Sequence, residues 1–195
     1  MEYTSNGFIV TEGPELVNGI GYYGVDTNVW PIGQTFSSQL ATEIKEIAYV
    51  DLAFPLLIDL PSALQYYSEC NRLGISPRLL YCETECKNSS VVISEFCNST
   101  YCTFLGYDYA YPSGDYYSAV ANDIIYRKDE FSIKWKTYIN QYGLIPSEKL
   151  IQLFAIERME ALQKNPNALS FETGNFVIFR VFSVDYAELI KHLTE

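Results

Sequence analysis

The sequence predicts one globular domain, residues 1–195, of the α/β or α+β class, in which helices pack on a mixed β-sheet. Apolar runs typical of buried strands alternate along the chain with segments whose apolar residues recur at helical spacing. The composition, 48% hydrophobic and 19% charged, is that of a globular protein. A chain of this length buries most of its apolar surface without disulfides or metals.

The first half of the chain predicts strands around one clear helix. Residues 1–40 are rich in Gly, Asn and Thr, which indicates short strands and turns. The run EIAYVDLAF, residues 46–54, predicts a buried strand. Asp59 can cap a following helix, and Gly74 favours its end in a left-handed conformation. Because the run RLLYCE at 78–83 predicts the next strand, these elements form a βαβ unit if the strands are parallel.

The middle of the chain is less regular. Residues 85–102 predict a loop or hairpin, and residues 103–111 a strand. Asp115 follows a Pro-Ser-Gly turn and can begin a helix, because its carboxylate accepts from unpaired backbone N–H groups. Residues 131–142 fit a strand or a helix, and the Gly143 that follows them favours the helix.

Three elements complete the predicted fold. Ser147 can cap a helix that ends before the Asn-Pro pair at 165–166. The nearly continuous apolar run FVIFRVF, residues 176–182, predicts a central strand buried on both faces. Residues 185–193 predict a final helix.

The charge of the chain restricts its partners. It has 13 basic and 24 acidic residues, a net charge of −11 and a pI near 4.5. Nucleic-acid binding depends on Lys and Arg displacing counterions, so nucleic acid is not expected as a partner. No apolar run approaches the roughly eighteen residues of a membrane span, so no membrane partner is expected. The start MEYTSNGFIV does not resemble an export signal, and the prediction is a cytoplasmic protein.

The five cysteines suggest one cofactor. Their odd number without an export signal favours reduced thiols over disulfides. Two close pairs, Cys82 with Cys86 and Cys97 with Cys102, could place four thiolates tetrahedrally around zinc. The usual two-residue spacer is missing, and four soft side chains near strands are the simpler interpretation. We therefore expect no cofactor and keep zinc as the alternative.

Sequence patterns for catalysis are sparse, and we expect no catalytic residues. The GxGxxG at 19–24 is followed by poor helix-forming residues, so its glycines indicate hairpin turns rather than a nucleotide site. The single histidine, His192, falls in the last turn of the final predicted helix, where a cation is favoured by the helix dipole. A carboxylate-dependent enzyme remains an alternative, with Asp51, Asp108 and Asp115 as candidates.

One short stretch stands out. FLGYDYAYPSGDYYS, residues 104–118, contains five tyrosines and two aspartates. Strand alternation places Leu105 and three tyrosines on one face of the predicted strand. Such a face is either core packing or an interface, because tyrosine serves both purposes. On the interface interpretation the partner-binding residues are Asp108, Tyr109, Tyr111, Asp115 and Tyr116.

The segment LGYDYAYPSGDYYSAVANDI, with the later run WKTYINQYGLIPSEKL, resembles the small acidic immunity proteins encoded beside bacterial polymorphic toxins. The resemblance covers the middle of the chain and includes no diagnostic motif. It implies a bacterial, cytoplasmic, single-domain inhibitor whose acidic and aromatic residues mask the basic active site of a toxin. The partner would thus be a protein, most concretely a cationic toxin domain. The alternatives are a phage or bacterial protein that binds a small ligand, such as a nucleotide signal, and the carboxylate-dependent enzyme.

Overall fold

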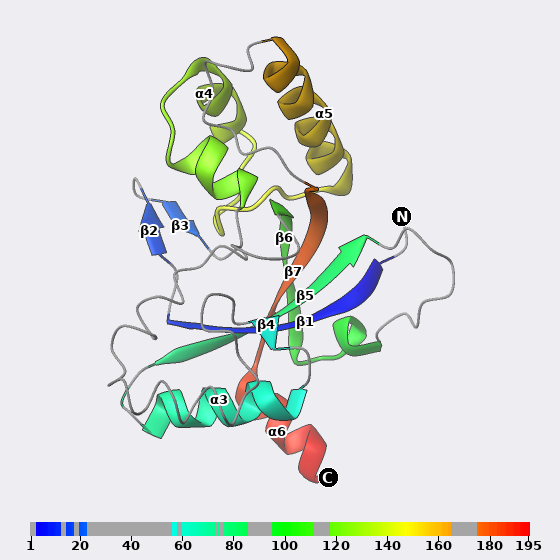
Figure 1. The fold of residues 1–195 in the computed structure, drawn as a ribbon. Coiled ribbons are helices and arrows are strands. Elements are labelled where there is room, and N and C mark those ends of the chain that lie inside the picture. The colour runs from blue at the N-terminus through cyan, green and yellow to red at the C-terminus, as the bar shows by residue number, and fades with distance from the viewer. Residues whose placement is uncertain are drawn as a thin grey trace.

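The computed structural model describes residues 3–12, 15–17, 20–22, 56–57, 60–72, 74, 76–85, 95–110, 118–164 and 175–195. These residues form an α+β domain built on one antiparallel sheet (Figure 1). Helices α3 and α6 lie at one end of the sheet, and α4 and α5 lie at the other. Of the two classes predicted from the sequence, α/β or α+β, the structure shows α+β.

The sheet has the strand order β4-β1-β5-β7-β6. Its strands are β1 (Tyr3–Glu12), β4 (Leu56–Leu57), β5 (Pro77–Glu85), β6 (Cys102–Ala110) and β7 (Val177–Val184). Every pairing among these strands is antiparallel. The sequence predicted a mixed sheet, so this prediction is wrong for the described strands.

A split βαβ arrangement is present, but its first strand is β4 and not the predicted segment 46–54, which lies outside the described residues. Strands β4 and β5 each pair antiparallel with β1, so they run in the same direction with β1 between them. Helix α3 (Leu60–Arg72) connects them. It ends as expected, because Gly74 has φ of 79° and donates its N–H to the Asn71 carbonyl at 3.0 Å.

Strand β7 lies in the interior of the sheet, as the nearly continuous apolar run predicted: it pairs with β5 on one side and with β6 on the other. Core clusters cover both of its faces, which explains why both are apolar. Phe179 and Val181 point to one face, and Phe182 and Val184 pack in the core on the opposite face. The helix that follows, α6 (Tyr186–Thr194), is capped by Asp185, which accepts from the Glu188 N–H at 3.1 Å.

Two helices and one π-helical turn cover the far end of the sheet. The π-helical turn η2 spans Ala121–Ile125, α4 spans Glu130–Lys136, and α5 spans Glu148–Lys164. Residues 131–142 are thus helical in their first half, as favoured by the sequence, and continue as turns. The cap predicted for α5 is present, since the Leu150 N–H donates to Ser147 Oγ at 3.4 Å.

Short elements complete the description. The hairpin of β2 (Glu15–Val17) and β3 (Ile20–Tyr22) contains part of the GxGxxG pattern, and Gly21 pairs with Leu16 in it. The hairpin interpretation of these glycines is thus confirmed for that part. A 3₁₀ turn, η1 (Glu95–Asn98), precedes β6. The strand predicted at 46–54 lies outside the described residues.

Candidate functional site

Strand β6 carries the tyrosine-rich stretch, and a bulge changes its faces. The register against β7 shifts between Phe104 and Gly106, so one extra residue is inserted there. Leu105 consequently packs in the core on the face opposite Tyr107 and Tyr109. The expectation that Leu105 shares a face with the tyrosines is therefore wrong, because alternation is interrupted at the bulge.

Gly106 is required where the bulge meets the chain after α4. Its φ is 151°, and a Cβ there would lie 2.7 Å from the Leu144 Cβ. This close approach lets Tyr107 and Ile145 exchange two backbone hydrogen bonds, of 2.8 and 3.0 Å. The Asn140 side chain also donates to the Leu105 carbonyl at 2.7 Å. The bulge thus anchors residues 140–145 to the sheet.

Asp108 is a buried structural residue, with 0% of its surface exposed. Its carboxylate accepts from Ser118 Oγ at 2.7 Å and from the Tyr109 N–H at 2.8 Å. Ser118 Oγ in turn accepts from the Ala121 N–H at 3.0 Å, at the start of η2. The prediction that Asp108 contacts a partner is therefore contradicted, because the side chain has no exposed surface. Its carboxylate instead connects Ser118, before η2, to β6.

Tyr109 is half-buried and packs between two aromatic rings. Its ring meets Phe154 edge-on at 6.1 Å and stacks on Phe176 at 5.3 Å. The core-packing interpretation thus describes its ring. Tyr111, Asp115 and Tyr116 lie outside the described residues, as does Asp51. The structure therefore does not show the predicted partner-binding residues gathered on one surface.

The cysteines that the structure describes do not converge on one point. Cys82 packs in the core on one face of the sheet, and its burial raises the pKa of its thiol. Cys97 and Cys102 pack against the core on the other face, and burial raises the pKa of Cys102 to about 11. Because the sheet lies between Cys82 and the other two, they cannot be ligands of one zinc ion. Cys86 lies outside the described residues.

A fully buried ion pair fixes the inner face of α5. Arg158 Nε donates to Asp123 Oδ2 at 2.6 Å, and Asp123 belongs to η2. The Arg158 guanidinium also lies 4.3 Å from the centroid of the Phe176 ring. This pair connects α5 with η2, and it gives the arginine a charged partner among the buried apolar residues of the helix.

The exposed side of α5 carries three large apolar residues among its charged ones, whereas most surface helices are polar there. Leu153, Ile156 and Met159 are spaced at i, i+3 and i+6, and they are 44%, 57% and 46% exposed. We call these three residues the α5 stripe. Carboxylates flank it on the same helix, at Glu157 and Glu160.

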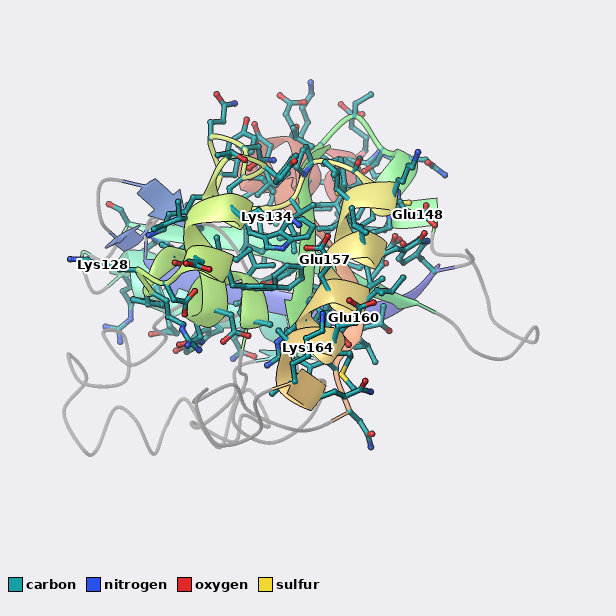
Figure 2. The ribbon with its side chains drawn as sticks, turned by 90° about the horizontal axis from the view of Figure 1, so that it is seen from above. Lys128, Lys134, Glu148, Glu157, Glu160 and Lys164 are labelled. Atoms are coloured by element: carbon teal, nitrogen blue, oxygen red, sulfur yellow. The ribbon has the colours of Figure 1, made fainter. Side chains whose placement is uncertain are left out.

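A groove of about 420 Å³ lies between α4 and α5, next to the α5 stripe. Its lining includes the apolar residues Phe131 and Ala161 together with acidic and basic side chains. It is lined by Glu130, Phe131, Lys134, Glu157, Glu160, Ala161 and Lys164. Figure 2 shows Lys134 on α4 facing Glu157 on α5, with Glu160 and Lys164 further along the same helix.

Glu157 is the most constrained carboxylate of this groove. It accepts from Lys134 Nζ at 2.6 Å and from the Trp135 indole N–H at 3.1 Å. The Lys134 ammonium also lies 5.7 Å from the centroid of the Trp135 ring. The groove therefore already binds one cation, supplied by the chain itself. Together with the α5 stripe it forms the candidate site, and none of its residues was among those predicted to contact a partner.

The chain matches no protein-family model, no curated protein and no solved structure. Within the described residues, no helix combines the length and the apolar character needed to cross a membrane. Among the same residues, no group of three or more His, Cys, Asp and Glu side chains is placed to hold a metal ion.

Proposed function

We propose that this chain is a non-catalytic binding protein that captures a cationic protein, in the manner of an immunity protein that neutralises a basic toxin. The observation that supports this most is the α5 stripe, with Leu153, Ile156 and Met159 exposed at three-residue intervals along one helix. Large apolar side chains gathered on a surface, and bordered by polar ones, are typical of protein interaction sites.

The α5 stripe has the arrangement by which one helix face recognises a partner. Leu153 and Ile156, at i and i+3, are neighbours on the helix surface. Met159 follows three residues later, so the α5 stripe turns by about 120° around the helix from end to end. Covering a half-exposed Leu, Ile or Met adds binding free energy at roughly 25 cal/mol per Å² of apolar surface. Three such residues are a sufficient centre for an interface whose rim is polar.

The charge of the chain favours a cationic partner. A net charge of −11 attracts a basic protein over long distances and raises the association rate. Glu157 and Glu160 place carboxylates at the edge of the α5 stripe, where they meet the partner on contact. The α5 stripe supplies affinity in this proposal, and the charge supplies speed and selectivity.

The test is co-expression of the chain with the products of the genes adjacent to its own. We expect one of these products to be a basic protein that slows growth, and we expect the wild-type chain to restore growth and to co-purify with it. Leu153→Ser/Ile156→Ser should lose both effects, because it removes two residues of the α5 stripe and leaves the inner face of α5 intact. Lys149→Ser, on the same helix, serves as the matched control.

Two results would contradict the proposal. One is that no adjacent gene product binds the wild-type chain. The other is that the double variant, shown to be folded by circular dichroism, rescues growth and co-purifies as well as the wild-type chain does.

A further inference from the structure

The groove between α4 and α5 contains an ammonium group that shows what the groove can recognise. Lys134 Nζ is held at 2.6 Å by Glu157 and lies over the Trp135 ring. The Trp135 N–H fixes the same carboxylate at 3.1 Å, so Glu157 stays directed into the groove when Lys134 leaves. Trp135 itself is fully buried, so the group that the groove offers to an incoming cation is the Glu157 carboxylate, a general partner for cationic side chains.

We infer that this groove is the binding site for an arginine or lysine side chain of the protein partner, which replaces Lys134 at the Glu157 carboxylate. The inference rests on the proposed function, since it supposes a cationic protein docked on the adjacent α5 stripe. It adds the residue that the groove recognises and the internal competitor that the partner must displace.

Lys134 is easily displaced. Half of its side chain is exposed, and its flexible stem lets the ammonium turn into solvent without moving α4. Exposed pairs of this kind contribute about 0.2–1 kcal/mol, so the exchange costs little. An incoming guanidinium has more donors in a planar arrangement, and it can bind the carboxylate through two of them.

The rest of the groove fits a long cationic side chain. Two of the lining residues, Phe131 and Ala161, are apolar and can contact the methylene stem of an incoming arginine or lysine. Glu130 and Glu160 add negative charge at the walls. Lys164 approaches Glu160 at 3.9 Å, and both side chains are more than half exposed, so this pair leaves the groove open. The volume of about 420 Å³ is larger than one side chain needs. The groove therefore has room for part of the peptide backbone beside that side chain.

The probe for this inference is the peptide N-acetyl-Gly-Arg-Gly-amide, titrated into ¹⁵N-labelled protein. The readout is the NMR signal of the Trp135 indole N–H, which bonds to Glu157, assigned with a Trp30→Phe variant. We expect a saturable shift in the wild-type protein. Lys134→Met should tighten binding by about threefold, because it removes the competitor. Glu157→Gln should abolish the shift.

Two matched controls separate recognition from general charge attraction. Glu160→Gln changes the net charge as Glu157→Gln does, and it should weaken binding less than twofold. The citrulline peptide N-acetyl-Gly-Cit-Gly-amide has nearly the same shape without the charge, and it should leave the signal unmoved. The inference is overturned if Lys134→Met fails to tighten binding, if Glu157→Gln binds like the wild-type chain, or if Glu160→Gln has an equal effect.

The two proposals fail separately. The peptide titration needs no partner protein, so loss of its signal would remove the arginine site and leave the co-purification result standing. Conversely, a chain that binds the peptide but rescues no growth would keep the groove and lose the proposed toxin.

Discussion

Two ion pairs meet α5 at neighbouring residues, and they have the same length in opposite surroundings. Arg158 contacts Asp123 at 2.6 Å, with side chains that are 1% and 0% exposed. Glu157 contacts Lys134 at 2.6 Å, with side chains that are 27% and 51% exposed. Distance alone therefore does not distinguish a pair that fixes the fold from one that can exchange partners. Burial distinguishes them.

The physical reason is the solvent available to each charge. When one member of a buried pair is removed, the other is left without water and without a partner, which costs several kcal/mol. When one member of an exposed pair is removed, water replaces it and little is lost. The inner pair is thus suited to connecting α5 with η2, and the outer pair is suited to recognition.

The largest expected effect is on the inner pair. Arg158→Met keeps an unbranched side chain but leaves the Asp123 carboxylate buried without its 2.6 Å partner. We expect the free energy of unfolding to fall by about 3–5 kcal/mol, measured by urea denaturation. Because Arg127 Nη1 lies 3.9 Å from Asp123, the lower end of this range is the firmer expectation. A loss below about 1 kcal/mol would contradict the structural role of this pair.

A second buried carboxylate should show an intermediate effect. Asp108→Ala removes an acceptor of Ser118 Oγ and of the Tyr109 N–H, so a buried and a part-buried hydrogen bond are both lost. We expect a loss of about 1–3 kcal/mol in the free energy of unfolding. Asp108→Asn retains an acceptor oxygen and should lose less. Equal stability of Asp108→Ala and the wild-type chain would show that the carboxylate does not anchor η2.

The outer pair should contribute little to stability. Glu157→Gln keeps the length of the side chain and an acceptor for the Trp135 N–H. We therefore expect the free energy of unfolding to change by less than about 1 kcal/mol. A larger loss in urea denaturation would mean that Glu157 is a structural residue, and it would remove the basis for an exchange of cations in the groove.

The smallest expected effect is the salt dependence of the stability losses caused by Glu157→Gln and Arg158→Met. At roughly 1 M NaCl the screening length falls to about 3 Å, which weakens exposed pairs far more than buried ones. The few tenths of a kcal/mol lost in Glu157→Gln should disappear in high salt. The loss in Arg158→Met should persist. If both losses respond equally to salt, burial does not divide the two pairs as argued.

Local patterns predicted much of the fold. Strand β7 follows from a nearly continuous apolar run, and the predicted cap at Ser147 lies within three residues of the N–H group that it binds. These signals are contained in short windows. The bulge at Gly106 is not, because it depends on the close approach of Leu144, which lies 38 positions further along the chain.

Part of the candidate site could be predicted from the sequence. The inward residues of α5, such as Ile151, Phe154 and Arg158, follow from helical spacing. Leu153, Ile156 and Met159 fall outside this inward face on a helical wheel. The wheel therefore predicts that these apolar residues are exposed. The groove is different, because Lys134 and Glu157 stand 23 residues apart on two helices. Asp108 was misassigned to the surface because its partner Ser118 lies ten residues further along the chain, where strand alternation no longer predicts which side chains meet.

The place of β7 between β5 and β6 has a consequence for synthesis. Strands β5 and β6 are not neighbours in the sheet, and only residues 177–184 join them. A nascent chain emerging from the ribosome therefore exposes two unpaired strand edges until those residues are released. Closure of the sheet is consequently a late event, and a chain interrupted before β7 would be a target for chaperones and proteases.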